Sequence, residues 1–556
     1  MIRGVRREAA TFAALLIAAA AAALSAQAPP SPSSNKLGRI DFSTSGTPDA
    51  QAHFLTGALL LHSFEFEDAA TEFRKAEEIE PGFAMAYWGE AMTYNHPLWA
   101  EQDLDAARKA LEKLAATPEA RRAKAPTLRE KMYLDAVEAL YGDGDKPARD
   151  RAYSEAMRRL YEQFPDDLDG ASFYALSILG ACEGKRDTAQ YMKAAAIVEE
   201  VFAKNPDHPG AAHYLIHCYD DPVHAPLGMR AARVYATIAP SATHALHMPS
   251  HIFLASGMWP EVVSSNEASW KASVDRADRL KLGPDAHSFH ALSWLEYGYL
   301  QQGRYADARK TLALMEADAA AGASSGRAKA GFASMRAAYV VETRRWKSDA
   351  VAMQTPADDA HRDLDLFTTG FAAIESGDRA GARKALAAMS AKPSTGGGGG
   401  GGSAHSHGGG AMSYPGGSSA DAVLRQLLEA RIEMADGNRD RAITRAKSAA
   451  ALEDGLNYEF GPPDVVKPAH ELLGEMLLEA GRPADARKEF ETALARYPGR
   501  ALSLLGLARA ASKAGDAAAA KDAYARLAAI WSRADTDVPE LAEVRSGAPP
   551  TEAAGR

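Results

Sequence analysis

Two segments more than 400 residues apart place small, aromatic and proline residues at the same intervals. In the first segment, Gly57 is followed by Ala69, Phe73, Ala76 and Pro81. In the second segment, Gly474 is followed by Ala486, Phe490, Ala493 and Pro498. A spacing shared by two distant segments indicates an internal repeat. A repeat restricts the fold to architectures that stack one structural unit many times.

The residue types predict what the unit looks like. Small residues such as Gly474 and Ala486 allow two helices to cross closely, and large ones such as Phe490 fill the layer between neighbouring units. Pro498 ends a helix, because proline cannot donate to the helical hydrogen-bond ladder. Each unit is therefore expected to be a pair of antiparallel helices.

This spacing resembles that of the tetratricopeptide repeat, a unit of about 34 residues. The same frame fits further segments around Gly303, Gly377, Gly437 and Gly515, and gives about eleven units over residues 50–530. The resemblance implies an all-α fold, a right-handed superhelical solenoid of antiparallel helix pairs. It also implies a scaffold that binds a protein or peptide partner in its concave groove.

Composition and spacing divide the chain into six parts. We predict a signal peptide over 1–28, a disordered lead-in over 29–48, an N-terminal solenoid over 49–390, a flexible Gly/Ser-rich loop over 391–420, C-terminal repeats over 421–531 and a disordered tail over 532–556. The loop includes the glycine- and serine-rich run 394–419, with His405 and His407. A tolerated insertion and a loose metal-catching lid are both open interpretations of that run.

The N-terminus has the features of an export signal. A basic start with Arg3, Arg6 and Arg7 precedes an apolar run of 13 residues, Phe12 to Leu24, and then small residues. The run is short for a membrane span, and this order is typical of a cleavable signal peptide. We expect an exported protein, periplasmic in a Gram-negative bacterium, with no transmembrane segment in the mature chain.

Charge and cysteine content exclude some classes of protein. The chain has 63 basic and 73 acidic residues, a formal charge of −10, and no strongly basic stretch interleaved with aromatics, so nucleic acid is not an expected partner. Only Cys182 and Cys218 are present, which rules out a disulfide scaffold and a four-thiolate zinc site.

Histidines are concentrated in residues 208–290. Nine of the chain's 16 histidines lie there: His208, His213, His217, His224, His244, His247, His251, His287 and His290. Histidine is the commonest side-chain metal ligand and the usual acid–base group near neutral pH. This density calls for an explanation beyond chance.

The repeat frame places most of these histidines on one side of three successive units. The predicted groove residues are His213, His217, His244, His247, His251, His287 and His290, with Asp220 and Asp221 as carboxylates that bind a metal or orient an imidazole. His208 and His224 are expected to be capping or solvated residues. Pro249 is expected to kink the helix that carries His244, His247 and His251.

Three interpretations of the cluster remain open at this stage. The histidines line a groove as ordinary polar residues, they bind a metal, or they bind an acidic or phosphorylated ligand. An imidazole-rich site favours zinc, copper, nickel or iron over calcium or magnesium. Met248 and Cys218 nearby favour copper slightly, and more than four histidines allow a dinuclear centre.

No standard catalytic signature accompanies the histidines. The HMPSH run, His247 to His251, has the spacing of the zinc-protease helix but lacks its glutamate, and neither a nucleotide loop nor a nucleophile elbow occurs. We therefore predict an exported scaffold that binds a protein or peptide, without enzymatic activity. The alternative is a zinc, copper or iron protein, or a metal-dependent hydrolase or oxidoreductase, that uses the histidine cluster.

Overall fold

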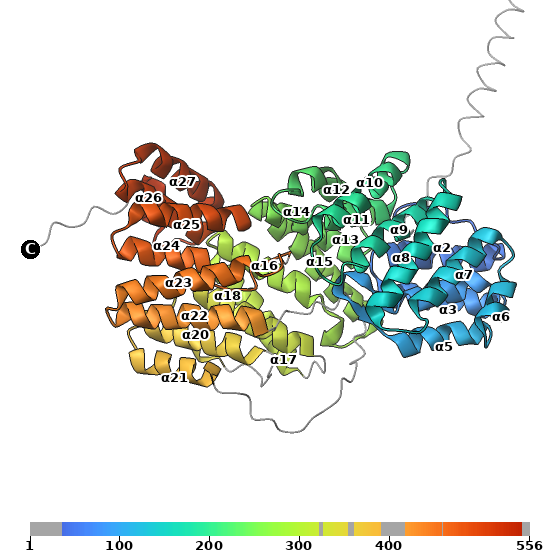
Figure 1. The fold of residues 1–556 in the computed structure, drawn as a ribbon, viewed down its shortest axis with the longest axis horizontal. Helices are drawn as coiled ribbons and strands as arrows, with labels where there is room; N and C mark the ends of the chain where they lie inside the picture. The colour runs from blue at the N-terminus through green and yellow to red at the C-terminus, as the bar shows by residue number, and fades with distance from the viewer. Residues whose placement is uncertain (1–35, 322–325, 354–360, 391–417, 459, 548–556) are drawn as a thin grey trace, which may run out of the picture. The chain divides into compact units, whose positions relative to one another are not determined.

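The structure is a computed structural model that describes residues 36–321, 326–353, 361–390, 418–458 and 460–547. Nearly all described secondary structure is helical (Figure 1). The one sheet among the described residues is a short antiparallel hairpin, in which β1 (Asn95–His96) pairs with β2 (Glu101–Gln102). The all-α class and the helical repeat architecture predicted from the sequence are confirmed.

The helices follow one another as antiparallel pairs. In chain order they are α2 (Pro48–His62), α3 (Phe66–Ile79), α4 (Ala84–Met92), η1 (Pro97–Trp99), α5 (Leu104–Leu114), α6 (Pro118–Lys124), α7 (Leu128–Leu140), α8 (Lys146–Gln163), α9 (Leu168–Gly180), α10 (Thr188–Lys204), α11 (Pro209–Cys218), α12 (Ala225–Ile238), α13 (Thr243–His247), α14 (Pro249–Ala255), α15 (Trp259–Leu280), η2 (Pro284–Ala286), α16 (Phe289–Gln301) and α17 (Tyr305–Ala320). The remaining elements are α18 (Gly326–Thr343), α19 (Asp349–Ala352), α20 (Arg362–Glu375), α21 (Arg379–Ser390), α22 (Ser418–Ala435), α23 (Arg439–Asp454), α24 (Ala469–Glu479), α25 (Pro483–Arg496), α26 (Ala501–Lys513), α27 (Ala517–Ile530), η4 (Trp531–Arg533) and α28 (Leu541–Ser546).

The repeat spacing corresponds to one packing device used at both ends of the chain. The Phe73 ring packs against two glycines of neighbouring helices, and a Cβ placed on Gly57 or Gly89 would lie 2.8 or 2.3 Å from it. The Phe490 ring lies in the same way, 2.9 Å from a Cβ on Gly474 and 2.2 Å from one on Gly506. Glycine is needed at these positions because any side chain would overlap the ring.

Buried apolar side chains form two clusters that meet on α15. Val262 belongs to the cluster of the N-terminal helices, and Val263 belongs to the cluster of the C-terminal helices. The next helix, α16, also contributes to both clusters, with Trp294 in the first and Leu295 in the second. The histidine-rich segment therefore lies where the two cores join.

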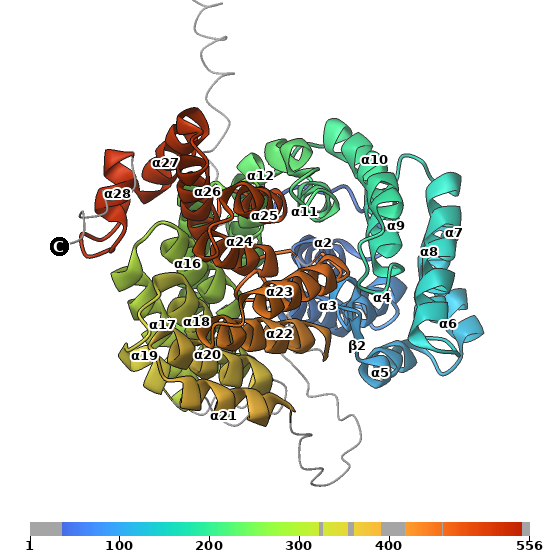
Figure 2. The same cartoon turned by 60° about the vertical axis from the view of Figure 1, so that its left-hand side comes forward.

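The C-terminal repeats also contact the N-terminal ones directly (Figure 2). Trp259 Nε1 donates to the carbonyl of Gly499 at 2.9 Å. Asn457, in the segment between α23 and α24, donates to the carbonyl of Gly184 and accepts from the backbone N–H of Arg186. Such contacts go beyond the neighbour-to-neighbour packing of a simple solenoid.

Two predicted disordered segments are ordered where the structure describes them. In the lead-in, Leu37 and Phe42 are both buried. The Phe42 ring packs against Phe54, Trp88 and Tyr133. In the tail, η4 and α28 continue the fold because their apolar side chains, among them Leu541 and Val544, pack into the C-terminal core. The predictions of disorder over 36–48 and 532–547 were therefore wrong.

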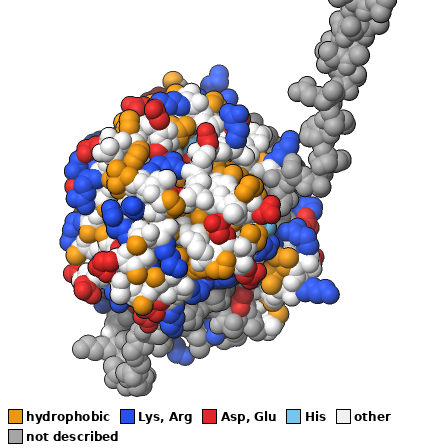
Figure 3. Space-filling view, turned by 90° about the vertical axis from the view of Figure 1, so that its right-hand side faces the viewer, with side chains coloured by type: hydrophobic (Ala, Val, Ile, Leu, Met, Phe, Trp, Pro, Cys, Tyr) orange, Lys and Arg blue, Asp and Glu red, His pale blue; other side chains and the backbone are white. Residues whose placement is uncertain are grey.

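Other predicted segments fall outside the described residues. They are the signal peptide 1–28, most of the glycine-rich loop (391–417, with His405 and His407) and the last residues, 548–556. Among the described helices, none combines the length and apolar character needed to cross a bilayer. On the face drawn in Figure 3, basic and acidic side chains are interspersed.

Candidate metal centre

Three neighbouring elements bring six histidines together. α11 carries His213 and His217, one turn apart on the same face. The segment α13–α14 carries His244, His247 and His251, and α16 carries His290. The predicted break at Pro249 is present, since α13 ends at His247 and α14 begins at Pro249.

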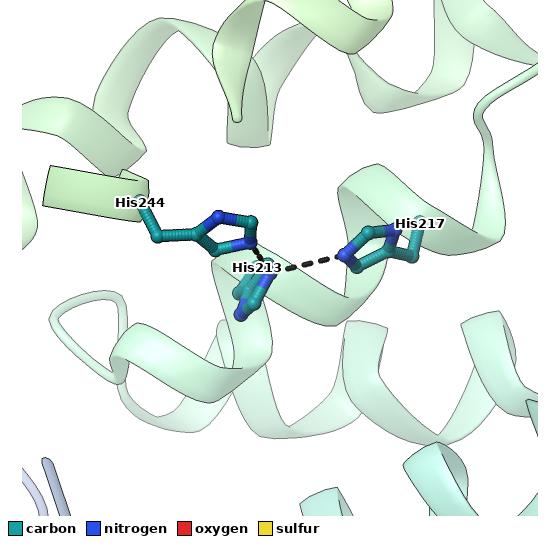
Figure 4. Close-up of side chains that lie close together, drawn as sticks. All are labelled: His213, His217 and His244. Carbon is teal, nitrogen blue, oxygen red and sulfur yellow. Dashed lines mark hydrogen bonds between the residues drawn. The ribbon is translucent and has the colours of Figure 1, made fainter. Parts of the chain in front are cut away.

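The first triad consists of His213, His217 and His244 (Figure 4). His213 Nε2 lies 3.0 Å from His217 Nε2 and 3.2 Å from His244 Nε2. One ring nitrogen from each of the three residues lies within 4.8 Å of the other two. If a metal binds two such nitrogens at about 2.0–2.1 Å, the nitrogen–metal–nitrogen angle is about 95–105°, which is within the range of metal–imidazole sites.

The second triad consists of His247, His251 and His290. His247 Nε2 lies 3.0 Å from His251 Nε2, and the His290 ring centroid lies 4.3 Å from that of His247. His290 Nδ1 is buried without a hydrogen-bond partner among the described residues. This triad therefore contains an imidazole nitrogen with unmet bonding capacity.

The two triads lie side by side. The rings of His217 and His251 are 5.7 Å apart between centroids, and those of His244 and His247 are 6.0 Å apart. Each pair joins one residue of the first triad to one of the second. Ions held in the two triads would be close neighbours in one buried space.

Hydrogen bonds on the far side of three rings fix their tautomers. His213 Nδ1 lies 2.7 Å from the carbonyl of His62, His247 Nδ1 lies 2.6 Å from Asn266 Oδ1, and His251 Nδ1 lies 2.5 Å from Asp220 Oδ2. The Asn266 amide is itself oriented, because its Nδ2 donates to the carbonyl of Val262. Each Nδ1 faces an acceptor and so carries the proton.

This assignment leaves lone pairs facing each other in the second triad. With Nδ1 protonated, a neutral imidazole has only a lone pair at Nε2. His247 Nε2 and His251 Nε2 therefore face each other at 3.0 Å with no hydrogen between them. A cation between the two nitrogens, either a metal ion or an added proton, removes this repulsion.

Aromatic side chains cover the cluster. Phe64 lies against all three rings of the first triad, with a centroid separation of 4.3 Å from His213. Phe460 reaches His217 and His251, and Trp294 contacts all three rings of the second triad. Phe64 has a φ of +56°, a left-handed conformation that is strained for a bulky side chain and occurs often at functional sites.

The histidines are consequently buried, which corrects the prediction of an open groove at this face. His213, His217, His247 and His251 are at most 3% exposed. Burial, reinforced by the neighbouring imidazoles, holds the pKa of five of the rings well below the ordinary value: His213, His217, His244, His247 and His290. Neutral imidazole is the form that binds a metal.

Two of the predicted site residues lie outside both histidine triads. Asp221 pairs with Arg186 at 2.5 Å and accepts hydrogen bonds from the backbone and ring of His224, so it stabilises the turn after α11. His287 is in extended backbone before α16, and its Nδ1 lies 2.7 Å from Asp318 Oδ2. Asp220, in contrast, orients His251 as predicted from its position.

A third polar cluster lies behind the first triad. His62 Nε2 and His208 Nε2 lie 3.0 and 3.4 Å from the same oxygen of Asp169, and His62 Nδ1 lies 2.9 Å from the Tyr214 hydroxyl. His208 Nδ1 accepts from the backbone N–H of Ala211 and caps α11, as expected of a capping residue. Both ring nitrogens of His62 are engaged within this cluster, whereas His208 Nε2 has no hydrogen-bond partner among the described residues. The cluster is therefore a third group that could hold a metal, with more of its polar atoms paired than in the second triad.

Sequence reasoning missed the groups that orient and cover the histidines. Asn266 is on α15, Phe64 follows α2, and Phe460 comes from a segment about 200 residues further along the chain. Nothing in the composition of the segment 454–467, which carries Phe460, linked it to the histidines. Cys182 and Cys218 are free thiols outside both triads.

Comparison with known proteins identifies one repeat family over part of the chain. The family model described as tetratricopeptide repeat matches residues 477–542. The chain therefore contains tetratricopeptide repeats over these residues. The match covers the C-terminal repeats that carry Phe490, so the predicted resemblance is confirmed there, and the same glycine–phenylalanine packing recurs at Phe73.

Solved structures of helical repeats are similar to this chain at low identity. Yeast Tom70 is 12% identical, over 90% of this chain and 94% of that chain, with a TM-score of 0.27. Human IFIT1, solved as a dimer with m7Gppp-AAAA, is 13% identical over 89% and 92%, with a TM-score of 0.35. The P58(IPK) TPR domain is 13% identical over 84% and 98%, with a TM-score of 0.24. No curated protein matches the chain.

Proposed function

We propose that this chain binds a pair of copper ions, one in each histidine triad. The observation that carries the proposal is the lone-pair contact between His247 Nε2 and His251 Nε2 at 3.0 Å. Asn266 and Asp220 hold both Nδ1 protons on the outer side. Outer partners of this kind orient metal-binding histidines and fix their tautomer.

Charge favours copper over the other metals that imidazole binds. All six candidate ligands are imidazoles, which bind a metal in their neutral form, and Asp220 is the carboxylate that touches one of their rings through a hydrogen bond. Each uncompensated charge in a buried site is costly. Two Cu(I) ions add two positive charges, whereas two Zn(II) ions add four, and three imidazoles suit Cu(I) well.

Copper also suggests the class of reaction. Two neighbouring copper ions can together transfer two electrons to a bound molecule, whose reduced, anionic form offsets the two added positive charges, so the proposed activity is that of an oxidoreductase. The helical repeat fold itself is suited to binding protein partners. A peptide seated on the histidine face is less well supported, because Phe64, Phe460 and Trp294 occupy the space over the rings.

Metal content of the purified chain tests the proposal. We expect two copper ions per chain after loading with Cu(I) and gel filtration, one after His213→Ala/His217→Ala, and one after His247→Ala/His251→Ala. His287→Ala is the control and retains two. Copper bound at trace level in the folded wild-type chain would refute the proposal, and two zinc ions bound more tightly than copper would refute the choice of metal.

We also propose that the protein is exported. The basic start, the apolar run Phe12 to Leu24 and the small residues after it support this step. The test is the N-terminal sequence of protein recovered from the periplasmic fraction of an expressing Gram-negative bacterium. Cleavage near residue 28 is expected, and an intact N-terminus confined to the cytoplasm contradicts export.

A further inference from the structure

A pocket lies beside the second triad, between α16, α18, α22 and the segment after Phe460. Trp294 and Phe460 line it, and both also contact the ring of His251. The opposite wall includes Met335 and Leu424. The pocket therefore shares two aromatic walls with the histidines, while its other lining residues come from α16, α18, α20, α22 and the segment after Phe460.

Glu296 is the unusual residue of this pocket. Its side chain lines the pocket and is 1% exposed, and neither carboxyl oxygen has a hydrogen-bond partner among the described residues. Burial raises the pKa of this carboxyl well above its usual range, although Arg309 acts in the opposite direction. A buried carboxyl without a partner destabilises the folded chain. A ligand group that pairs with this carboxyl therefore gains binding free energy.

The charged side chains around the pocket favour the binding of a cation. Asp421 and Asp464 also line it, and none of its described lining residues is Lys or Arg. An anion would meet three carboxyl groups there. A cation gains hydrogen bonds and charge pairing from the same groups.

The aromatic walls select for an apolar body next to that charge. Trp294, Tyr297 and Phe460 present ring surfaces, which attract both apolar groups and cations. Pockets that bind small molecules commonly combine apolar walls with a few polar groups that fix orientation.

We infer that this pocket binds a small organic amine, with the ammonium group on Glu296 and an aromatic or aliphatic body against Trp294 and Phe460. The inference stands on the pocket and its unpartnered carboxyl and does not require a metal. If copper occupies the second triad, the amine and the copper are neighbours, since Trp294 both lines the pocket and contacts the histidine rings.

Calorimetric titration of the full chain with three probes of the same shape tests the inference. The probes are 2-phenylethylamine, the neutral 2-phenylethanol and the anionic 3-phenylpropionate. We expect saturable binding of one amine per chain, at least about tenfold tighter than either other probe. The preference should be the same in copper-loaded and metal-stripped protein.

The variant Glu296→Gln keeps the size of the side chain and removes its ability to ionise when an amine binds. It should fold at least as stably as the wild type, lose the preference for the amine, and bind 2-phenylethanol unchanged. Glu316→Gln, on the exposed side of α17, is the control and should leave all three affinities unaltered. The inference is overturned if the amine shows no saturable binding at about 10 mM, if the alcohol binds as tightly, or if Glu296→Gln retains the preference. Metal content is measured separately, so this outcome is distinct from a failure of the copper proposal.

Discussion

The carboxylate of Asp220 accepts a 2.5 Å hydrogen bond from His251 Nδ1, although the two residues belong to different helical units. Asp220 follows α11, which carries two ligands of the first triad, and His251 is in α14 within the second. The contact both fixes a ligand tautomer and ties the two triads together.

Asp220→Asn should weaken copper binding at the second triad by about 10–100-fold, because the neutral amide orients the ring less firmly and adds no negative charge. Competition with a chromophoric copper chelator measures the affinity. Asp318→Asn is the matched control, since Asp318 makes the same contact with His287 at 2.7 Å outside the cluster. Equal losses in the two variants would contradict the assigned role of Asp220.

Phe460→Ala should accelerate the loss of copper to an external chelator several-fold, because Phe460 covers His217 and His251. The equilibrium number of ions should remain two, since no ligand is removed. Stopped-flow transfer of copper to the chelator gives the rate. Leu452→Ala, at an exposed position of α23, is the control, and an unchanged release rate in Phe460→Ala argues against a covering role.

Gly506→Ala should destabilise the C-terminal repeats by about 1–3 kcal/mol, because the new Cβ would lie 2.2 Å from the Phe490 ring. Denaturant unfolding measures the free energy. Adding Phe490→Leu should restore part of the loss, since the smaller side chain makes room, and this coupling is the decisive readout. Gly82→Ala is the control, because a Cβ there meets no atom within 4 Å.

Glu77, a buried carboxyl outside the histidine cluster, should make the free energy of unfolding depend on pH. Burial, with Glu90 beside it, raises the pKa of Glu77 from 4.5 to about 8, against the effect of Lys113. The folded chain then holds a proton that the unfolded chain releases above about pH 4.5. The contribution of Glu77 to the free energy of unfolding is fully present below that pH. It falls as the pH rises toward 8, by at most about 1.4 kcal/mol per pH unit.

Glu77→Gln should flatten that decline and leave the variant more stable than the wild type at pH 8, with little difference at pH 5. Thermal unfolding across this range is the measurement. Glu78→Gln, the exposed neighbour, should behave like the wild type. A wild-type stability that rises from pH 5 to pH 8 through this residue would show the opposite sign and refute the assignment.

The sequence was most informative where structure depends on local spacing. Helical periodicity put His213 with His217 and His247 with His251, and the repeat interval anticipated the packing of Phe73 and Phe490. His287 failed the same rule because it lies in extended backbone before α16, where an interval of three residues no longer means a shared face.

Features that depend on tertiary contacts were beyond the sequence pattern. Phe460 and Asn266 reach the histidines from other elements, and no motif marks either of them. The tail was predicted to be disordered from its polar composition, yet Leu541 and Val544 suffice to anchor α28. A few apolar residues at the correct spacing outweigh the average composition of a segment.

The position of Phe460 late in the chain implies an order in which the parts of the site form during folding. All six histidines precede residue 291, so a chain folding from its N-terminus completes both triads well before the covering side chain is available. Until the segment after α23 docks through Asn457 onto Gly184 and Arg186, the rings lack their C-terminal cover. Ions that enter between these two events meet uncovered rings, whereas ions that bind the folded chain must pass the C-terminal cover, so Phe460 should govern the rate of loading as well as the rate of release.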